Sequence, residues 1–295
     1  MHMNFDIGDG IDAAVNYILD NFSPVLDFIA AAIGFVTGTI HDLLTAAPMP
    51  VALAIFVLLS LWRVGIGFGL LTGIALWLVN QMGLWDAMME TLSLVIASTL
   101  MAMIVGLPLG IAMARKDSVA AVVRPILDLM QTMPAFVYLI PAAMFFGLGA
   151  VPGALATVIF SMPPVVRLTN LGIRQVHPEF IEAGNAFGCT SWQLLFKVQL
   201  PNAMPSIMAG INQTILLSLS MVVIASMIGA GGLGNTVLTG IQRLDVGTGF
   251  EGGLAVVILA VILDRLTQSL GKSRASFWQG LFRKNERKKM TTATA

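Results

Sequence analysis

The feature that most constrains this chain is a series of long apolar runs. A helix that crosses a bilayer needs about 20 mostly apolar residues, within a range of roughly 17–25. Charged residues make up only 11% of the chain, whereas soluble domains carry about 25%. We therefore predict an all-α polytopic membrane protein with about seven spans, at 47–62, 64–82, 91–114, 126–148, 151–166, 204–229 and 253–271.

The N-terminal third of the chain leaves two alternatives open. The first two spans are separated only by Arg63, so they either cross the membrane separately or form a tight hairpin that does not fully span. Before them, residues 1–46 place apolar residues at helical spacing, and Pro24 precedes a second apolar stretch. We predict an extracytoplasmic amphipathic helix on the membrane surface. The alternative is an eighth span at 25–40.

Basic residues set the predicted orientation, because Lys and Arg collect on the cytoplasmic side of short loops. If Arg63 is inside, Arg243 is the only basic residue of the outward loops. The inward segments then hold Arg115, Lys116, Arg124, Arg167, Arg174, Lys197 and the basic residues of the tail. This predicts an extracytoplasmic N-terminus, a membrane domain at 47–271 and a basic cytoplasmic tail at 272–295. The tail either anchors on the anionic inner leaflet or is solvated.

Charge balance and composition exclude several classes of protein. The chain has 16 Lys+Arg and 16 Asp+Glu, so it lacks the basic excess of a nucleic-acid-binding protein. Its single cysteine, Cys189, cannot form a disulfide framework, and its three histidines are too far apart to form a metal cluster. We therefore expect no nucleic-acid partner and no metal site.

The longest predicted cytoplasmic loop, 167–203, carries the clearest local signals. Pro178 stands where a helix would begin, and Gly188 is placed to end that helix in the left-handed conformation. Thr190 and Gln193 then form a capping-box pattern, which starts a second helix. The loop is therefore predicted to hold two short helices outside the bilayer, joined at Gly188.

The first of these helices has an apolar face made of Phe180, Ala183, Gly184 and Phe187. An apolar face exposed to the cytoplasm needs a cover. A partner protein and the chain's own helix ends are equally good candidates from periodicity alone.

The same loop resembles the EAA motif of ABC-importer permeases. That motif runs Glu-Ala-Ala, three residues, Gly, nine residues, Ile-x-Leu-Pro. Here the matching segments are Glu182-Ala183-Gly184, Gly188 and Val198-Gln199-Leu200-Pro201. This sequence differs from the motif at two positions, with Gly184 in place of the second Ala and Val198 in place of Ile. Pro201 marks the predicted return of the chain toward the membrane. The resemblance covers roughly 85–271, and segments 131–141 and 228–234 are similar to the glycine betaine/proline branch.

The resemblance implies a type I ABC-importer transmembrane domain that works as a homodimer in the bacterial inner membrane. Two ATP-binding subunits would dock on the loops, and an extracytoplasmic substrate-binding protein would deliver the substrate. The coupling residues would be Phe180, Glu182, Ala183, Gly184, Phe187, Gly188, Val198, Leu200 and Pro201. The chain has no Gly-rich phosphate loop, so ATP and Mg²⁺ would be used by the partner ATPase and this chain would bind no cofactor.

By resemblance, the substrate would be glycine betaine, proline betaine or a related quaternary ammonium compound such as choline. Another solute of the taurine or nitrate type is the alternative. An ion-coupled secondary transporter is disfavoured, because spans three to six lack ionisable residues near their middles.

Aromatic side chains provide the candidates for the translocation path. Ring faces attract quaternary ammonium ions, and the candidates are Phe136, Tyr138, Phe145 and Phe146. Aromatic side chains in spans more often face lipid or the core. The pattern Gly229-x-Gly231-x-x-Gly234 fits a dinucleotide-binding motif by letter, but it follows a membrane helix and not a strand. Its glycines are expected to let the outer end of the sixth span bend.

Overall fold

The computed structural model describes residues 7–271, and all the regular elements in that range are helical. They are α1 (Ile7–Thr45), α2 (Met49–Arg63), α3 (Ile66–Gln81), α4 (Trp85–Arg115), α5 (Asp117–Thr132), α6 (Phe136–Phe146), α7 (Ala150–Arg174), α8 (Pro178–Ala186), α9 (Ser191–Leu194), a π-helical turn (Leu195–Gln199), α10 (Leu200–Ala225), a 3₁₀ turn (Ser226–Ile228), α11 (Gly232–Arg243) and α12 (Val246–Gly271). The predicted all-α class is confirmed for the described residues.

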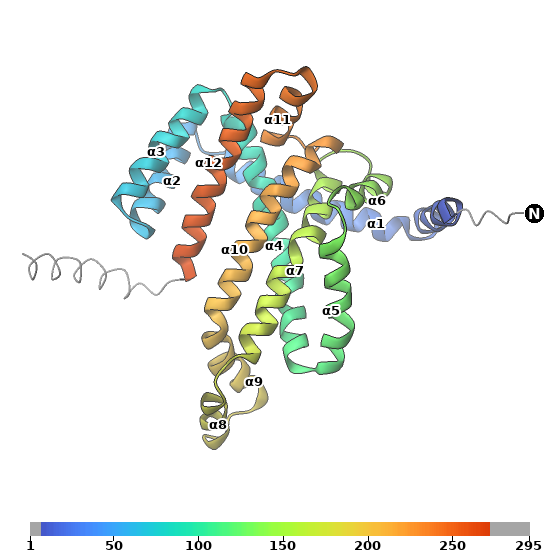
Figure 1. The fold of residues 1–295 in the computed structure, drawn as a ribbon, viewed down its shortest axis with the longest axis vertical. Helices are drawn as coiled ribbons and strands as arrows, with labels where there is room; N and C mark the ends of the chain where they lie inside the picture. The colour runs from blue at the N-terminus through green and yellow to red at the C-terminus, as the bar shows by residue number, and fades with distance from the viewer. Residues whose placement is uncertain (1–6, 272–295) are drawn as a thin grey trace, which may run out of the picture.

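Helices α4, α7, α10 and α12 form an elongated bundle (Figure 1). Glycines let α4 and α7 approach closely, because a Cβ at Gly110 would lie 2.7 Å from the carbonyl oxygen of Val166. A Cβ at Gly210 of α10 would likewise lie 3.2 Å from the carbonyl oxygen of Pro164. These small residues pack helices against each other, as is common in membranes.

Five helical stretches are long and apolar enough to cross a membrane, or six if the bent pair α5 and α6 is one span. The five are Val15–Thr45, Trp85–Arg115, Ala150–Arg174, Ser191–Ile228 and Val246–Leu270. The last four correspond to the predicted third, fifth, sixth and seventh spans. The count of about seven spans stays a prediction, and the described helices differ from it at the fourth span and in the N-terminal third.

The predicted fourth span, 126–148, is broken. It is divided between α5 and α6, which meet at 99°. Met133 is extended at the break, with φ −73° and ψ 136°, and it precedes Pro134. A residue before proline is driven out of the helical region by a clash with the proline ring, so the helix ends there.

The predicted first two spans are short helices that pack on each other. At 15 and 16 residues, α2 and α3 are each about 22–24 Å long, less than the hydrocarbon core of about 30 Å. Thr72 of α3 donates a hydrogen bond to the buried hydroxyl of Ser60 of α2. The lengths favour the hairpin alternative over two separate spans.

The N-terminal region forms one long helix with a kink at Phe22, two residues before Pro24. Its segment Val15–Thr45 has the length and apolarity of a span, in line with the alternative of a span at 25–40. Figure 1 shows α1 running across the long helices of the bundle and not alongside them. The position of this region on the outer membrane surface stays a prediction, and the predicted basic tail lies outside the described residues.

Candidate functional site

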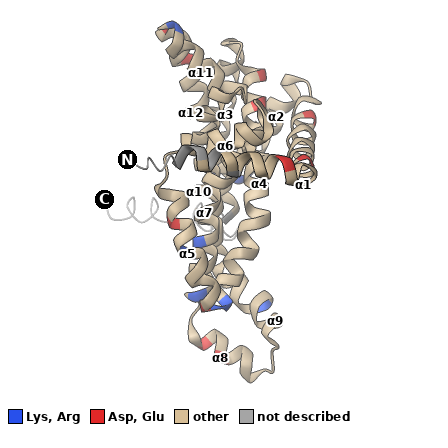
Figure 2. Cartoon of the chain, turned by 90° about the vertical axis from the view of Figure 1, so that its right-hand side faces the viewer, with Lys and Arg blue, Asp and Glu red and all other residues tan. Residues whose placement is uncertain are grey.

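The loop after α7 projects from one end of the bundle and carries α8 (Figures 1 and 2). α7 continues to Arg174, so residues 167–174 are helical and do not belong to the loop as predicted. The charge of Arg167 suggested the end of the span. However, a helix can leave the hydrocarbon without ending, and here Arg167 forms an ion pair with Asp128 of α5 at 2.5 Å.

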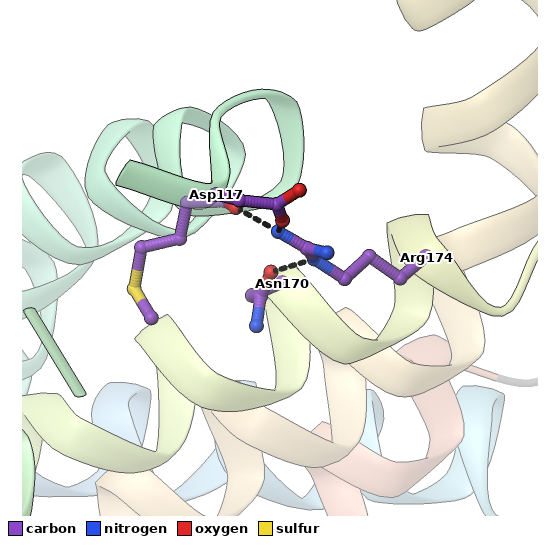
Figure 3. Close-up of polar contacts among 4 residues, drawn as sticks. Asp117, Asn170 and Arg174 are labelled. Carbon is purple, nitrogen blue, oxygen red and sulfur yellow. Dashed lines mark hydrogen bonds and ion pairs between the residues drawn. The ribbon is translucent and has the colours of Figure 1, made fainter. Parts of the chain in front are cut away.

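Arg174, in the last turn of α7, binds the corner between α4 and α5 (Figure 3). Its Nη2 donates to the carbonyl oxygen of Met113 at 2.6 Å and to Asp117 at 2.7 Å, and its Nε donates to Asn170 at 2.9 Å. Met113 lies in the last turn of α4, where carbonyl groups lack partners within the helix. One side chain therefore ties three helices together just before the loop.

α8 begins and ends where the sequence predicts. It starts at Pro178, and Gly188 has φ +75°, in the left-handed region. The N–H of Cys189 donates to the carbonyl of Gly184, and the N–H of Phe187 donates to that of Ala183. These bonds satisfy the free carbonyl groups at the end of the helix, which is the usual role of a glycine at this position.

The capping box at the start of α9 is also confirmed. The N–H of Gln193 donates to the Thr190 hydroxyl, and the Gln193 side chain accepts from the Thr190 N–H. However, the second helix is not short, because helical structure runs without a break from Ser191 to Ile228. Pro201 lies in the first turn of α10, the helix that follows the loop, without an interruption of the helical structure. Proline lacks an N–H and would clash with the carbonyl four residues earlier, and the wider π turn just before it accommodates both effects.

The apolar face of α8 divides into two parts. Gly184 is buried against the chain itself, and a Cβ there would lie 2.6 Å from a methyl group of Leu194. In contrast, Phe187 is 90% exposed and Phe180 is 49% exposed. Cover by the chain's own residues is therefore found for Gly184 only, and cover of the rest of the face by a partner protein stays a prediction. The chain covers Gly184, whereas the two phenylalanines are uncovered in the single chain.

The other coupling residues lie around these contacts. Glu182 and Ala183 are exposed on α8, while Val198 and Leu200 are half-buried. Pro201 is exposed in the first turn of α10. The loop thus presents Glu182, Ala183 and both phenylalanines outward.

The four aromatic path candidates have different surroundings. Tyr138 is buried, donates its hydroxyl to the carbonyl of Met130 and lies edge-on to Phe160. Phe145 and Phe146 are half-buried and contact each other edge-to-face, with ring centroids 6.4 Å apart. Phe136 is 54% exposed. Tyr138 is thus engaged within its own chain, and a path role for the four residues stays a prediction.

A contact between α4 and α11 was not expected from the sequence. Glu90 accepts a hydrogen bond from the N–H of Gly232 at 2.7 Å, and Thr91 accepts from the N–H of Leu233 at 2.8 Å. Both N–H groups lie at the N-terminus of α11, where a carboxylate is favoured by the helix dipole. The chain does bend at the glycines as expected, since Gly229 has φ +83°. Glu90 carries no local signal, because its partner is 142 residues away.

Replacing Glu90 with alanine is expected to destabilise the protein by about 1 kcal/mol, as for loss of a helix cap, because the Gly232 N–H loses its acceptor. Thermal unfolding of the purified full-length chain measures this effect. Glu90→Gln, which keeps an acceptor, should lose less stability. The control is Glu251→Ala, which removes an exposed carboxylate of α12. Equal unfolding temperatures for wild type and Glu90→Ala would contradict the prediction.

Comparison with known proteins identifies the family. The model for "Binding-protein-dependent transport system inner membrane component" matches residues 106–275, which includes the whole loop. The chain belongs to this family. The permease is 48% identical to the glycine betaine/proline betaine transport system permease protein ProW of Escherichia coli, over 90% of this chain and 75% of that one. It is also 48% identical to the glycine betaine transport system permease protein OpuAB of Bacillus subtilis, over 92% and 96% of the two chains.

The fold of the permease is also found among solved structures. An inward-facing MetNI methionine ABC transporter chain matches with a TM-score of 0.55 at 24% identity, over 66% of this chain and 93% of that one. The predicted family resemblance is confirmed. The chain is a multi-pass inner membrane permease, a transport component and not an enzyme, and its class implies an ATPase and a substrate-binding protein as partners.

Proposed function

We propose that this permease forms the translocation path for glycine betaine, proline betaine or a related quaternary ammonium compound such as choline. The relatives carry the substrate part of the proposal. ProW and OpuAB are named for betaines, and a 49% identical permease of Listeria monocytogenes, GbuB, is named for glycine betaine and carnitine. A taurine- or nitrate-type solute is the second choice, since none of these relatives is named for one.

The observation that carries the coupling role is the uncovered outward face of α8. Phe180 and Phe187 are large apolar side chains that are exposed on one helix, and an exposed apolar face favours a protein contact. We infer that this face docks on the ATP-binding subunit and that this end of the bundle is cytoplasmic. Most basic residues of the bundle lie toward this end, and Arg243 on α11 lies at the opposite end (Figure 2).

Two sets of contacts connect this loop to the bundle. Arg174 ties the end of α7 to α4 and α5, and Gly184 seats α8 against Leu194 of α9. α9 then continues without a break into α10. A displacement of α8 by the ATPase would therefore move α7 and α10 together, as alternating access requires.

The remaining partners follow from the same proposal. Two copies of the permease, with two ATP-binding subunits, would enclose one path, and the ATPases would bind ATP and Mg²⁺ while this chain binds no cofactor. A quaternary ammonium ion has no N–H to donate, so its recognition relies on aromatic faces. The substrate-binding protein would supply that recognition. Phe136, Phe145 and Phe146 stay candidates for the path, and Tyr138 is the weakest of the four because it is packed within its own chain.

Uptake of radiolabelled glycine betaine tests the substrate. Cells that lack other betaine importers would express the permease with its partner ATPase and binding protein. Uptake that excess proline betaine or choline suppresses, and taurine does not, supports the proposal. Uptake of taurine but not glycine betaine would overturn it.

Replacing Arg174 with methionine is expected to lower the uptake rate severalfold while the transporter still assembles. The variant keeps a long apolar side chain but loses the hydrogen bonds to Met113 and Asp117. The end of α7, where the loop begins, is then held less firmly against α4 and α5. Arg124→Met, which removes an exposed cation of α5, is the control and should transport normally. Unchanged uptake in Arg174→Met would show that this connection does not transmit motion.

A further inference from the structure

A groove of about 720 Å³ lies beside the loop, between the end of α4, the start of α5 and the α9 segment. Its wall is mostly apolar and includes Pro108, Ile111, Val119, Leu195 and Phe196. Arg115 and Lys116, at the C-terminal end of α4, also line it. The volume falls within the range of about 300–1,000 Å³ that is typical of sites for small molecules. None of the proposed coupling or path residues lines it.

The two basic residues have no acidic partner within the described part of the chain. Asp117 is the next residue along, but its carboxylate accepts from Arg174. The ion pairs of residues 7–271 are that pair and Arg167–Asp128. The positive charge of Arg115 and Lys116 is therefore available to a ligand in the groove.

Aromatic side chains hold Arg115 at the mouth of the groove. Its guanidinium lies 4.9 Å from the centre of the Trp192 ring, and Trp192 stacks on Phe196 with centroids 5.7 Å apart. A cation–π contact does not use a hydrogen-bond acceptor, so the N–H groups of Arg115 can still donate to a ligand. It also fixes the cation close to the apolar wall.

Along α4, the lining of the groove changes from apolar at Pro108 and Ile111 to basic at Arg115. Pro108 and Arg115 are separated on α4 by about 10 Å, at 1.5 Å per residue. Arg115 ends a helix that is long and apolar enough to span the membrane. Basic residues at the end of a span lie at the level of the lipid headgroups. An apolar groove with two cations at that level matches an acyl chain joined to an anionic phosphate.

We propose that this groove binds an anionic phospholipid of the surrounding leaflet, with an acyl chain along α4 and the headgroup phosphate at Arg115 and Lys116. The site goes beyond the transport function and does not depend on which solute is carried. A zwitterionic lipid would bind less well, since its positive group would oppose the two cations. Each basic residue near a membrane surface contributes about a fivefold preference for anionic lipid.

Native mass spectrometry of the assembled transporter tests the site. The complex would be purified from nanodiscs that hold equal amounts of phosphatidylglycerol and phosphatidylcholine, and the retained lipid would be measured. Wild type is expected to retain phosphatidylglycerol in excess. The double variant Arg115→Gln/Lys116→Gln should lose roughly tenfold or more of that preference. Arg124→Gln removes a cation of α5 outside the groove, so it should keep the preference.

A photo-activatable phosphatidylglycerol locates the bound lipid independently of these variants. Cross-links are expected on peptides that hold Ile111–Val119 and Trp192–Phe196. A third variant, Ile111→Trp, fills the apolar end and should reduce these cross-links without any change of charge. Equal retention of the two lipids by wild type, an unchanged preference in the double variant, or cross-links confined to other helices would each overturn the proposal. Glycine betaine uptake plays no part in these measurements, so failure of the substrate assignment would not affect them.

Discussion

Replacing Gly188 with valine is expected to abolish uptake and substrate-stimulated ATP hydrolysis while membrane insertion stays intact. Gly188 has φ +75°, a conformation that a β-branched residue adopts only under strain. A Cβ at this position would have no atom within 4 Å, so the strain lies in the backbone and not in packing. The chain would relieve it by ending α8 differently, which would displace the adjacent Phe187 from the docking face.

The control for this variant is Gly188→Asn. Asparagine tolerates the left-handed conformation better than other residues with a side chain, and it ends helices in the same way. Uptake by Gly188→Asn should therefore be close to that of wild type. If the valine and asparagine variants lost activity equally, the backbone conformation would not be the cause. Normal uptake by Gly188→Val would contradict the proposed role of this helix end.

Replacing Glu182 with lysine is expected to abolish assembly with the ATPase and therefore uptake. Glu182 is exposed on α8, and no residue in the described part of the chain forms an ion pair with it. Its charge is thus available to a partner surface, and its reversal would place a like charge opposite the groups that bind it. Co-purification of the ATPase with the permease measures the loss.

The matched control is Glu179→Lys, which makes the same change of charge one turn earlier on α8. It removes a favourable interaction with the helix dipole, worth about 0.3–1 kcal/mol, but it lies outside the motif. The ATPase should therefore still co-purify with this variant. Retention of the ATPase and normal uptake in Glu182→Lys would refute the docking role.

Local patterns in the sequence predicted most of the loop correctly. The residues that begin and end its helices act on backbone groups only a few residues away, so their effects can be inferred from the neighbouring sequence. They are Pro178, Gly188, Thr190 and Gln193. The long helices of the bundle were found in the same way, since hydropathy depends only on the local segment. The break at Pro134 has a local signal too, in the restriction on the residue before proline. Residues 126–148 were nevertheless predicted as one span, because the segment is apolar on both sides of Pro134.

Contacts between distant segments were not predictable. Arg174 was assigned to a loop by its charge, but it donates to the carbonyl of Met113, 61 residues earlier. Glu90 accepts from the N–H of Gly232 at the start of α11, 142 residues later. In both cases the partner is a backbone group, which every residue carries, so the sequence contains no sign of the pairing. The burial of Gly184 against Leu194 also requires the angle between α8 and α9, which no local pattern sets.

We propose that this permease couples an external ATPase to the import of a quaternary ammonium compound. The most direct test reconstitutes the permease in proteoliposomes with its partner ATPase and binding protein. ATP hydrolysis is then measured with and without glycine betaine-loaded binding protein. We expect the loaded protein to stimulate hydrolysis in wild type and not in Gly188→Val. Failure of the permease and ATPase to assemble, or hydrolysis that the loaded binding protein does not change, would contradict the claim.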